Sequence, residues 1–384
     1  MVKQQRCLML FSAAIKSEAT KITYLWQLDK FKEWAEIKTY DGLLEAPDKD
    51  LQILLEDYTM YLKSKISPNS VPIYFAPIEL FYVMNDKTLN FKKIRKLFPE
   101  KIKKGNDRAY SHQEIRKMLD TCKDYRTRAF VLLLATSGAR LGAIPDVRIR
   151  HMKKIEDCYA IQIYEDSLQE DYIFTTPETA TAIDDYLQQR RNDLETIHDE
   201  SPLFRTIYET GVINPNSCNK AALSHIVDKL KVPRRKSAKT GRFDVAIHHG
   251  FRKFFATTIK QVDTISPTMS EKLINHVGIV QLDGSYFKPT LEQMYESYKK
   301  AIPDLTFSNE QRDHLKIEAL KKEVETIDNL KTRLEIVERQ KEDVQNDLKD
   351  KISEHKWDIQ VMKNNLIADV LKELEEREKK EKRI

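Results

Sequence analysis

One segment of this 384-residue chain dominates its interpretation, His249-Gly250-Phe251-Arg252-Lys253-Phe254-Phe255-Ala256-Thr257. If the segment is helical, His249 and Arg252 share one face because they are three residues apart. A second arginine, Arg140, lies upstream. Guanidinium groups hold a phosphate through paired, charge-assisted hydrogen bonds and are not titrated at neutral pH. Two arginines and a histidine of this kind indicate a site for a phosphate group.

His276 and Tyr286, which both lie downstream of the segment, extend this chemistry. A histidine donates or accepts protons near neutral pH. A tyrosine hydroxyl can attack phosphorus and hold the broken product as a covalent ester. Arg140, His249, Arg252, His276 and Tyr286 are therefore, in this order, the side chains needed to break a phosphodiester bond without a metal ion.

Four local strings carry a resemblance to the tyrosine recombinases, the phage-integrase family. Thr136-Ser137-Gly138-Ala139-Arg140 resembles the family's "TGLR" segment, and the segment that begins at His249 resembles its "HxLRHTFAT" box. Ile274-Asn275-His276-Val277-Gly278 resembles "LGH", and Ser285-Tyr286-Phe287-Lys288-Pro289 follows where the family has its nucleophile. The last two strings look most like archaeal integrases. The His-x-x-Arg box is the most specific of the four.

The resemblance covers about residues 15–303 and implies a mainly α-helical fold with a small β-sheet. It implies an N-terminal helical core-binding domain, which binds DNA and ends in a basic linker, at residues 1–104. A catalytic domain at residues 105–305 follows. Residues 306–384 lie outside the family pattern, and their composition predicts a C-terminal long helix or coiled coil.

The activity that the resemblance implies is site-specific DNA recombination through a 3′-phosphotyrosyl intermediate. Family members need neither ATP nor a metal, so no cofactor is expected. Strand exchange takes four cleavages, which implies a tetramer on two double-stranded DNA sites. Integration of a virus or mobile element is the expected setting. Arg140 and Arg252 would hold the phosphate, His249 and His276 would handle protons and contact it, and Tyr286 would be the nucleophile.

Bulk properties are compatible with this interpretation and exclude some others. The 65 basic and 60 acidic residues leave a net charge of +5, which permits DNA binding but does not argue for it alone. The four cysteines are scattered, without zinc spacing, as in a reduced cytoplasmic protein. No apolar run approaches the roughly 20 residues of a membrane span. We therefore expect a cytoplasmic protein with no membrane partner.

Local patterns predict helices in the N-terminal part and one hairpin in the middle. With only 9 glycines and 13 prolines, the chain is expected to be mostly helical. Ser111-His112-Gln113-Glu114 is a capping box that opens a helix, and Pro177 opens another. Tyr159-Ala160-Ile161-Gln162-Ile163-Tyr164 and Asp171-Tyr172-Ile173-Phe174-Thr175 alternate as two strands around a turn.

Two basic stretches are candidate DNA-backbone contacts. A solvated helix face is the usual meaning of such a stretch, but the first lies between the two implied domains, where the family carries a linker along DNA. The second lies in a Gly-containing segment just before the His-x-x-Arg box. Together the candidates are Lys92, Lys93, Arg95, Lys96, Lys101, Lys103, Lys104, Arg234, Arg235, Lys236 and Lys239.

The C-terminal part changes composition sharply after Phe307. It contains no proline or glycine up to Leu374, and its apolar residues recur at three- and four-residue steps, as in a heptad seam. Lys331, Lys341 and His355 interrupt that seam, so we expect weak or irregular pairing. A helix that pairs with a partner or folds back is favoured over a solitary one.

Two departures from the family pattern bear on activity. The family usually has an acidic residue three positions after the first arginine, where this chain has Ala143. In family members a hairpin lysine protonates the leaving 5′-oxygen, but the turn here reads Asp166-Ser167-Leu168-Gln169-Glu170-Asp171. Without a general acid the leaving step would lose about 10²–10⁴ in rate. Lys236 and Lys239 are possible substitutes.

Three residues compete with the assigned ones. Tyr295 and Tyr298 follow Tyr286 closely, but Tyr298 lies in a helical segment that is expected to pack in the core. His248 adjoins His249 and points elsewhere on a helix, so it is the weaker candidate.

Two other functions are consistent with parts of the sequence. A DNA-binding protein of the same fold with weakened catalysis is supported by the missing lysine and opposed by the complete set of other site residues. A coiled-coil assembly factor would use only the C-terminal part and leaves the ordered motif unexplained.

Overall fold

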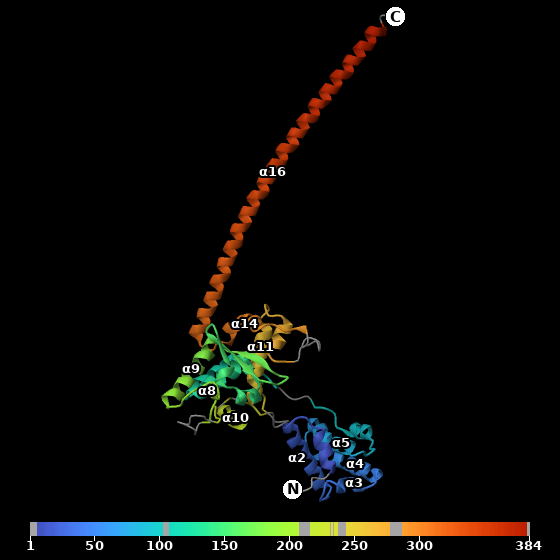
Figure 1. The fold of residues 1–384 in the computed structure, drawn as a ribbon, viewed down its shortest axis with the longest axis vertical. Helices are drawn as coiled ribbons and strands as arrows, with labels where there is room; N and C mark the ends of the chain where they lie inside the picture. Colours follow the sequence, from blue (N-terminus) through green and yellow to red (C-terminus); the bar gives the residue numbers. More distant parts are fainter. Residues whose placement is uncertain are drawn as a thin grey trace. The chain divides into compact units, whose positions relative to one another are not determined.

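The structure is a computed structural model and describes residues 6–102, 107–206, 216–230, 232, 234–236, 243–276 and 286–381. The chain forms two compact units, Met1–Asn106 and Asp107–Ile384 (Figure 1). Of the sequence-based candidates, Lys103, Lys104 and Lys239 lie outside the described residues. Each unit has its own hydrophobic core.

The first unit is helical throughout its described part. Its core is rich in aromatic rings, with Phe31 packed against Tyr58 at a centroid distance of 4.8 Å and against Tyr82 at 6.4 Å. Its elements are α1 (Arg6–Ala13), α2 (Glu18–Trp34), α3 (Gly42–Glu45), α4 (Asp48–Lys65), η1 (Pro68–Ser70), α5 (Val71–Met84) and α6 (Phe91–Leu97). The last of these carries most of the first basic stretch.

The second unit packs helices around a small sheet. Its described helices are α7 (His112–Thr121), α8 (Tyr125–Ser137), η2 (Leu141–Asp146), η3 (Ile149–His151), α9 (Pro177–Asn192), α10 (Lys220–Asp228), α11 (Ile247–Gln261), α12 (Pro267–Leu273), α14 (Leu291–Lys299), α15 (Ile302–Leu305) and α16 (Asn309–Glu381). The predicted capping box is present at Ser111, where the side chains of Ser111 and Glu114 each accept the other's backbone N–H. Pro177 opens α9, as predicted.

Helix α8 is the central element of this unit. Residues 129–137 are all buried, so no face of this part of the helix meets water. It lies against α9 and α11, and Thr136 Oγ1 is 2.9 Å from Thr179 Oγ1 of α9. Because the buried helix ends immediately before Arg140, the core fixes where that arginine emerges.

The sheet is antiparallel, in the order β1-β2-β3. The predicted hairpin is confirmed as β2 (Cys158–Ile163) and β3 (Asp171–Phe174), with Ile163 paired to Asp171 next to the turn. A third strand, β1 (Met152–Ile155), was not predicted. Its two middle residues are exposed lysines, so it lacks the alternation that marks a half-buried strand.

The mainly α-helical fold with a small sheet and a long C-terminal helix is confirmed. Helix α16 runs without a break from Asn309 to Glu381, farther than the predicted end near Leu374. In Figure 1 it is the orange-to-red helix at the C-terminal end. Within the described ranges, none of the helices combines the length and the apolar character needed to cross a bilayer.

Replacing Gly138 with alanine tests how tightly the end of α8 is built. Gly138 has φ +61°, and an added Cβ would lie 2.3 Å from Cδ1 of Phe255. Left-handed backbone costs an alanine about 1 kcal/mol, and overpacking about 1–3 kcal/mol more. We expect Gly138→Ala to lower the free energy of unfolding by about 2–4 kcal/mol in urea titrations.

The matched control is Gly142→Ala, where the added Cβ meets only the Tyr164 hydroxyl, at 4.0 Å. Its free energy of unfolding should change by less than about 0.5 kcal/mol. Equal stability of the two variants would show that the turn at Gly138 is not constrained.

Candidate active site

Arg140 is presented by the turn that ends α8. Gly138 caps the helix in the left-handed conformation, with φ 61° and ψ 17°. Arg140 then has extended backbone and precedes η2. Its side chain is half-buried, so it can reach a ligand while its position stays fixed by the core.

Helix α11 carries His249 and Arg252 on one side of its first turns. Gly250 lies between them and has no room for a side chain, because a Cβ there would come within 2.6 Å of both Val245 and the Tyr110 ring. Phe251 is fully buried. Gly250 and Phe251 thus pack this part of the helix against the core. His249 is exposed and Arg252 is buried.

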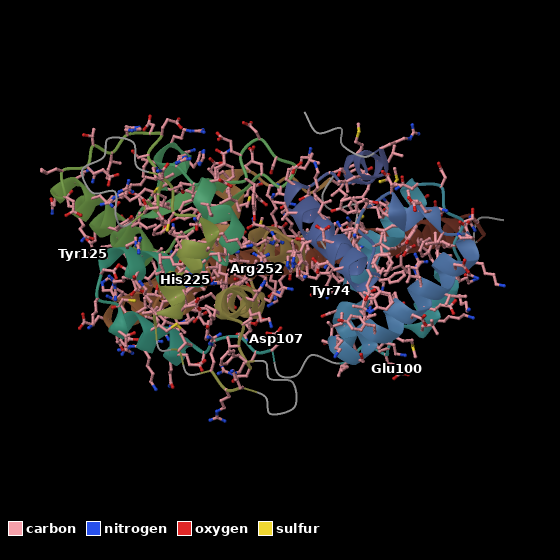
Figure 2. The ribbon with its side chains drawn as sticks, turned by 90° about the horizontal axis from the view of Figure 1, so that it is seen from below. Tyr74, Glu100, Asp107, Tyr125, His225 and Arg252 are labelled. Atoms are coloured by element: carbon pink, nitrogen blue, oxygen red, sulfur yellow. The ribbon has the colours of Figure 1, made fainter. Side chains whose placement is uncertain are left out.

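Arg252, labelled in Figure 2, belongs to α11 and bonds to two other segments of the unit. Its Nη1 donates to the Gly138 carbonyl at 2.6 Å, and its Nη2 donates to the Ile274 carbonyl. The first carbonyl lies two residues before Arg140 and the second two residues before His276. One side chain therefore holds the α8 turn and the end of α12 against α11.

The charges of Arg252 and Arg140 act on each other. Burial, and then the nearby charge of Arg140, lower the pKa of Arg252 to about 10. Both groups still carry a positive charge at pH 7, so two cations are held together in a partly desolvated place. A bound anion would relieve that cost, which is the electrostatic signature of a phosphate site.

His276 is oriented by a buried carboxylate. It follows α12 and Asn275, whose backbone is left-handed with φ 51°. Its Nδ1 is 3.1 Å from Oε2 of Glu271. An ionised carboxylate only accepts hydrogen bonds, so Nδ1 is the donor. The ring is about half exposed, and its Nε2 is left for a ligand.

Glu271 was not singled out by the sequence. Its carboxylate also accepts from Lys260, with Nζ 2.5 Å from Oε1. The hydrogen bond from Lys260 is the main reason that the pKa of Glu271 lies below its ordinary value. The sequence pattern that could have indicated Glu271 is a glutamate five residues before a candidate histidine, near the end of a helix. Only the fold shows that the two side chains meet.

Tyr164 is a second residue that the sequence did not single out. It follows β2 with a left-handed φ of 56°. Its hydroxyl lies 4.0 Å from where a Cβ on Gly142 would stand, and Tyr164 is among the groups that act to raise the pKa of Arg252. The end of the first hairpin strand thus lies close enough to Arg252 to act on its charge.

Tyr286 is the least constrained of the predicted site residues. Its side chain is 83% exposed, whereas its neighbour Phe287 packs against the core. Residues 277–285, which join it to His276, lie outside the described residues. Arg140, Arg252 and the His276 segment are brought together, but no contact joins Tyr286 to them in the described part.

The two competing tyrosines are core residues. Tyr298 is fully buried and its hydroxyl donates to the Thr136 carbonyl at 3.0 Å. Tyr295 is 3% exposed and donates to Glu156 at 3.2 Å. Burial raises the pKa of both phenols. Neither hydroxyl is free to meet a DNA phosphate, which favours Tyr286.

His248 faces away from the predicted site. Its Nε2 lies 2.9 Å from the Ser224 hydroxyl of α10, and burial lowers its pKa. The position three residues after Arg140 is equally structural, because Ala143 is fully buried. A carboxylate there would be desolvated without a described partner, which accounts physically for the departure at this position.

The hairpin turn contains no lysine, and Glu170 closes it. The Glu170 carboxylate accepts from the Asp166 amide at 2.8 Å and from Gln162 Nε2 at 3.0 Å. A lysine from elsewhere reaches the hairpin: Nζ of Lys272, on α12, lies 2.9 Å from Oδ1 of Asp171. The sequence did not suggest Lys272, because the two residues are distant along the chain.

The described lysines and arginines of the first basic stretch differ in their availability. Lys93 pairs with Glu56 at 2.6 Å, and Arg95 pairs with Glu79. The remaining described members are exposed: Lys92, Lys96 and Lys101. Two of the described cations are therefore paired with carboxylates of the same unit.

The second basic stretch is organised around one ring. The guanidinium of Arg234 lies 4.1 Å from the Phe243 ring centroid and Nζ of Lys236 lies 5.3 Å from it. The Arg235 amide donates to the Asp244 carboxylate at 2.9 Å. The described contact of the Lys236 ammonium is thus with the Phe243 ring and not with the β2–β3 hairpin.

No group of three or more His, Cys, Asp or Glu side chains within the described ranges is arranged to hold a metal ion.

Comparisons with known proteins give structural likenesses only. No protein-family model and no curated protein matches the chain. It is similar to the XerA recombinase at 19% identity, over 77% of this chain and 97% of that one, with a TM-score of 0.36. It is similar to the Tn1549 transposon integrase in complex with transposon right end DNA at 12% identity, over 77% of this chain and 99% of that one, with a TM-score of 0.48. It is similar to a lambda integrase dimer bound to a core site at 11% identity, over 74% of this chain and 93% of that one, also with a TM-score of 0.48.

Replacing Glu271 with glutamine tests its role beneath His276. Because the pKa of Glu271 is lowered by folding, its ionised form stabilises the protein above about pH 4.5. That contribution is lost as the pH falls through the lower folded-state pKa. We expect Glu271→Gln to reduce the free energy of unfolding by roughly 1 kcal/mol at pH 7.

Urea titrations at pH 7 and at pH 3 measure this effect. The difference between the variant and the parent should shrink at pH 3, which lies below the ordinary glutamate pKa of 4.5, because the unfolded carboxyl is then protonated. A difference of equal size at both pH values would mean that the Glu271 charge does not contribute.

Proposed function

We propose that the protein is a tyrosine recombinase of the phage-integrase family, which cleaves and rejoins DNA at specific sites. The observation that carries the proposal is the Arg252 side chain, which joins the Arg140 turn and the His276 segment to α11. The residues that converge there are those whose order along the chain resembles the family motif. Unlike the buried Arg190 and Arg205, which both pair with the Glu195 carboxylate, Arg252 donates only to backbone carbonyls in the described part.

The proposed reaction exchanges one phosphate ester for another. The Tyr286 oxygen bonds to phosphorus, the bond to the 5′-oxygen breaks, and the DNA is held as a 3′-phosphotyrosyl ester. Arg140 and Arg252 stabilise the charge that develops on the non-bridging oxygens. His249 takes part in proton transfer, and His276 donates from Nε2. The ester conserves the bond energy, so the reaction uses neither ATP nor a metal.

The departing 5′-oxygen requires a proton, and Lys272 is the candidate donor. Its ammonium contacts Asp171, which pairs with Ile163 in the sheet. The residue after Ile163 is Tyr164, which acts on the charge of Arg252. Lys272 therefore lies at the same end of the hairpin as the phosphate site. This assignment replaces Lys236 and Lys239 as substitutes for the family's hairpin lysine.

The proposed partner is double-stranded DNA carrying specific recombination sites. Exposed Lys92, Lys96 and Lys101, with the cations around Phe243, supply contacts to the phosphate backbone. The protein would act in the cytoplasm as a tetramer on two sites, and integrate a virus or mobile element of archaeal type.

One observation favours a second function, a DNA-binding protein with weakened catalysis. The hairpin turn has Leu168, which is fully exposed, where a lysine would be expected. If Lys272 does not serve as the acid, binding without efficient cleavage is the outcome.

Trapping of a covalent adduct tests the proposed function. Nicked suicide duplexes of randomised sequence, incubated with the full chain, should yield adducts that survive detergent and share a common sequence. Tyr286→Phe should abolish them because the attacking oxygen is absent. Electrophoresis in detergent, followed by sequencing of the retained DNA, provides the measurement.

Tyr295→Phe and Tyr298→Phe are the controls and should keep forming the adduct if they fold. An adduct that persists in Tyr286→Phe would move the nucleophile elsewhere. Sequence-selective binding without any adduct would favour the binding-only function.

Changing the leaving group tests Lys272 separately from the nucleophile. With an ordinary 5′-oxygen, we expect Lys272→Ala to slow adduct formation by about 10²–10⁴. With a 5′-bridging sulfur, which leaves without a proton, the rate should return to within about tenfold of the parent. Single-turnover kinetics on the selected duplex measure both rates.

Lys236→Ala and Lys239→Ala are the matched controls: any loss of rate in them reflects weaker DNA binding, so it should be equal with the oxygen and the sulfur substrate. Rescue by sulfur in either of these, or an unchanged rate in Lys272→Ala, would contradict the assignment.

A further inference from the structure

Helix α16 exposes a long apolar stripe. Ten aliphatic side chains of the stripe are 47–72% exposed, although residues of this kind are normally covered. They are Ile317, Leu320, Val324, Ile327, Leu334, Leu348, Ile352, Ile359, Met362 and Leu366. The helix makes no described contact along this stripe, so the surface lacks its partner within the described chain.

The ten residues fit one uninterrupted heptad frame. Steps of three and four residues run from Ile317 to Leu366 with no stutter, and only five of the core positions in this frame are polar: Lys331, Glu338, Lys341, Gln345 and His355. A constant frame of this kind keeps the stripe on one side of a supercoiled pair.

The aliphatic residues at the core positions favour two parallel strands. Of the eight a positions, four hold the β-branched Ile317, Val324, Ile352 and Ile359; of the seven d positions, three hold Leu320, Leu334 and Leu348, and two hold Ile327 and Met362. β-Branched residues at a with leucine at d favour a parallel dimer. Three further a positions are polar, Lys331, Glu338 and Gln345, and polar residues at a favour one register at a cost in stability.

A second copy in register is the best match for this stripe. In a parallel pair in register, each a or d residue packs against the same residue of the other helix. Each of the ten aliphatic residues therefore meets an aliphatic partner. The best antiparallel alignment gives only four apolar pairs, each occurring twice: Leu320–Leu366, Val324–Met362, Ile327–Ile359 and Leu334–Ile352. The central layers Glu338 and Lys341 weaken either arrangement.

The area available is sufficient for a stable pair. An aliphatic side chain removes roughly 60–120 Å² of apolar surface from water on full burial. For the stripe on two helices this amounts to about 1,200–2,400 Å², against about 1,200–2,000 Å² in stable interfaces.

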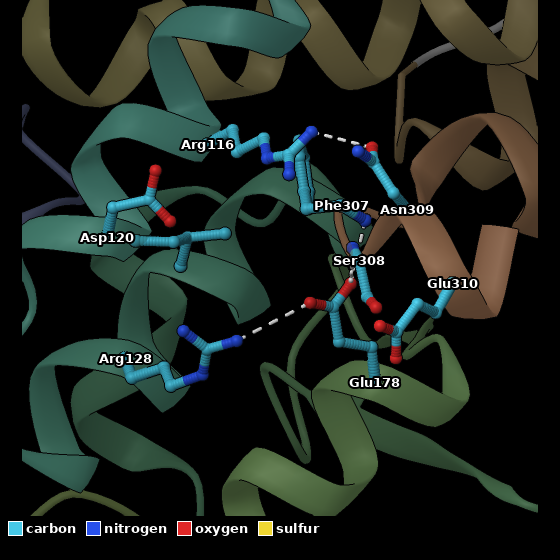
Figure 3. A pocket seen from close by; sticks show the side chains of 9 residues that line it. Arg116, Asp120, Arg128, Glu178, Phe307, Ser308, Asn309 and Glu310 are labelled. Atoms are coloured by element: carbon cyan, nitrogen blue, oxygen red, sulfur yellow. Dashed lines mark hydrogen bonds and ion pairs between the residues drawn. The ribbon is translucent and has the colours of Figure 1, made fainter.

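The start of α16 is fixed to the body of the second unit (Figure 3). The buried Glu178 carboxylate accepts from the Phe307 amide at 2.7 Å and the Ser308 amide at 3.3 Å. Arg116 donates to Asn309 at 2.6 Å. Phe307 is buried and stacks on His112 at 4.7 Å. The first residues of the helix are therefore held to the second unit by hydrogen bonds and packing.

We propose that α16 pairs in parallel and in register with α16 of a second copy, which makes the protein a dimer in the absence of DNA. This pairing does not depend on the proposed function. It differs from a tetramer assembled on recombination sites, because the interface is complete before DNA binds.

The mass of the full chain in DNA-free buffer tests the pairing. Light scattering at about 10 µM should give twice the 45.1 kDa of one chain. Ile352→Glu combined with Ile359→Glu should give the mass of one chain. Both positions are exposed in the single chain, so the variant keeps its fold. Asn329→Glu, on the opposite side of the helix, is the matched control and should stay dimeric.

Disulfide trapping tests the direction and register. Leu334→Cys should oxidise readily to a covalent dimer, whereas Asp343→Cys, on the opposite side, should not. A mixture of Val324→Cys with Met362→Cys should give no disulfide between the two variants. A single-chain mass at every concentration, a dimer in the double-glutamate variant, or a Val324–Met362 cross-link would overturn the proposal.

Discussion

The second unit depends on one buried interaction, the pair of hydrogen bonds from Arg252 to the carbonyls of Gly138 and Ile274. These carbonyls belong to segments that end two different helices, and a helix end leaves its last carbonyls without partners. The guanidinium satisfies both at once. It thereby fixes the turns that carry Arg140 and His276, although none of the three residues is near another in sequence.

This arrangement has an electrostatic cost that is visible in the fold. A guanidinium is desolvated beside a second one, and its pKa falls to about 10. Glu271 and Lys260 orient His276, and the Glu271 charge also acts to raise the pKa of Arg252, but burial and the Arg140 charge outweigh it. Two arginines are thus held under electrostatic strain where a phosphate is proposed to bind, which is typical of sites built for a ligand rather than for stability.

The sequence predicted the elements that have strong local signals. The capping box at Ser111, the start of α9, the hairpin strands and the long C-terminal helix all follow from residues within one or two turns. β1 was missed because two of its four residues are exposed lysines. Glu271 and Lys272 were missed because their partners are fixed by tertiary packing. The role of Tyr286 stays a prediction, since the residues that connect it to His276 lie outside the described part.

The Glu178 anchor at the start of α16 has a kinetic consequence. If two chains are joined through a helix that is fixed at its base, the separation of their catalytic units no longer depends on dilution. The effective concentration of one unit near the other is then set by geometry, in the millimolar range for short connections. Occupation of two neighbouring DNA half-sites would then become first order in the dimer.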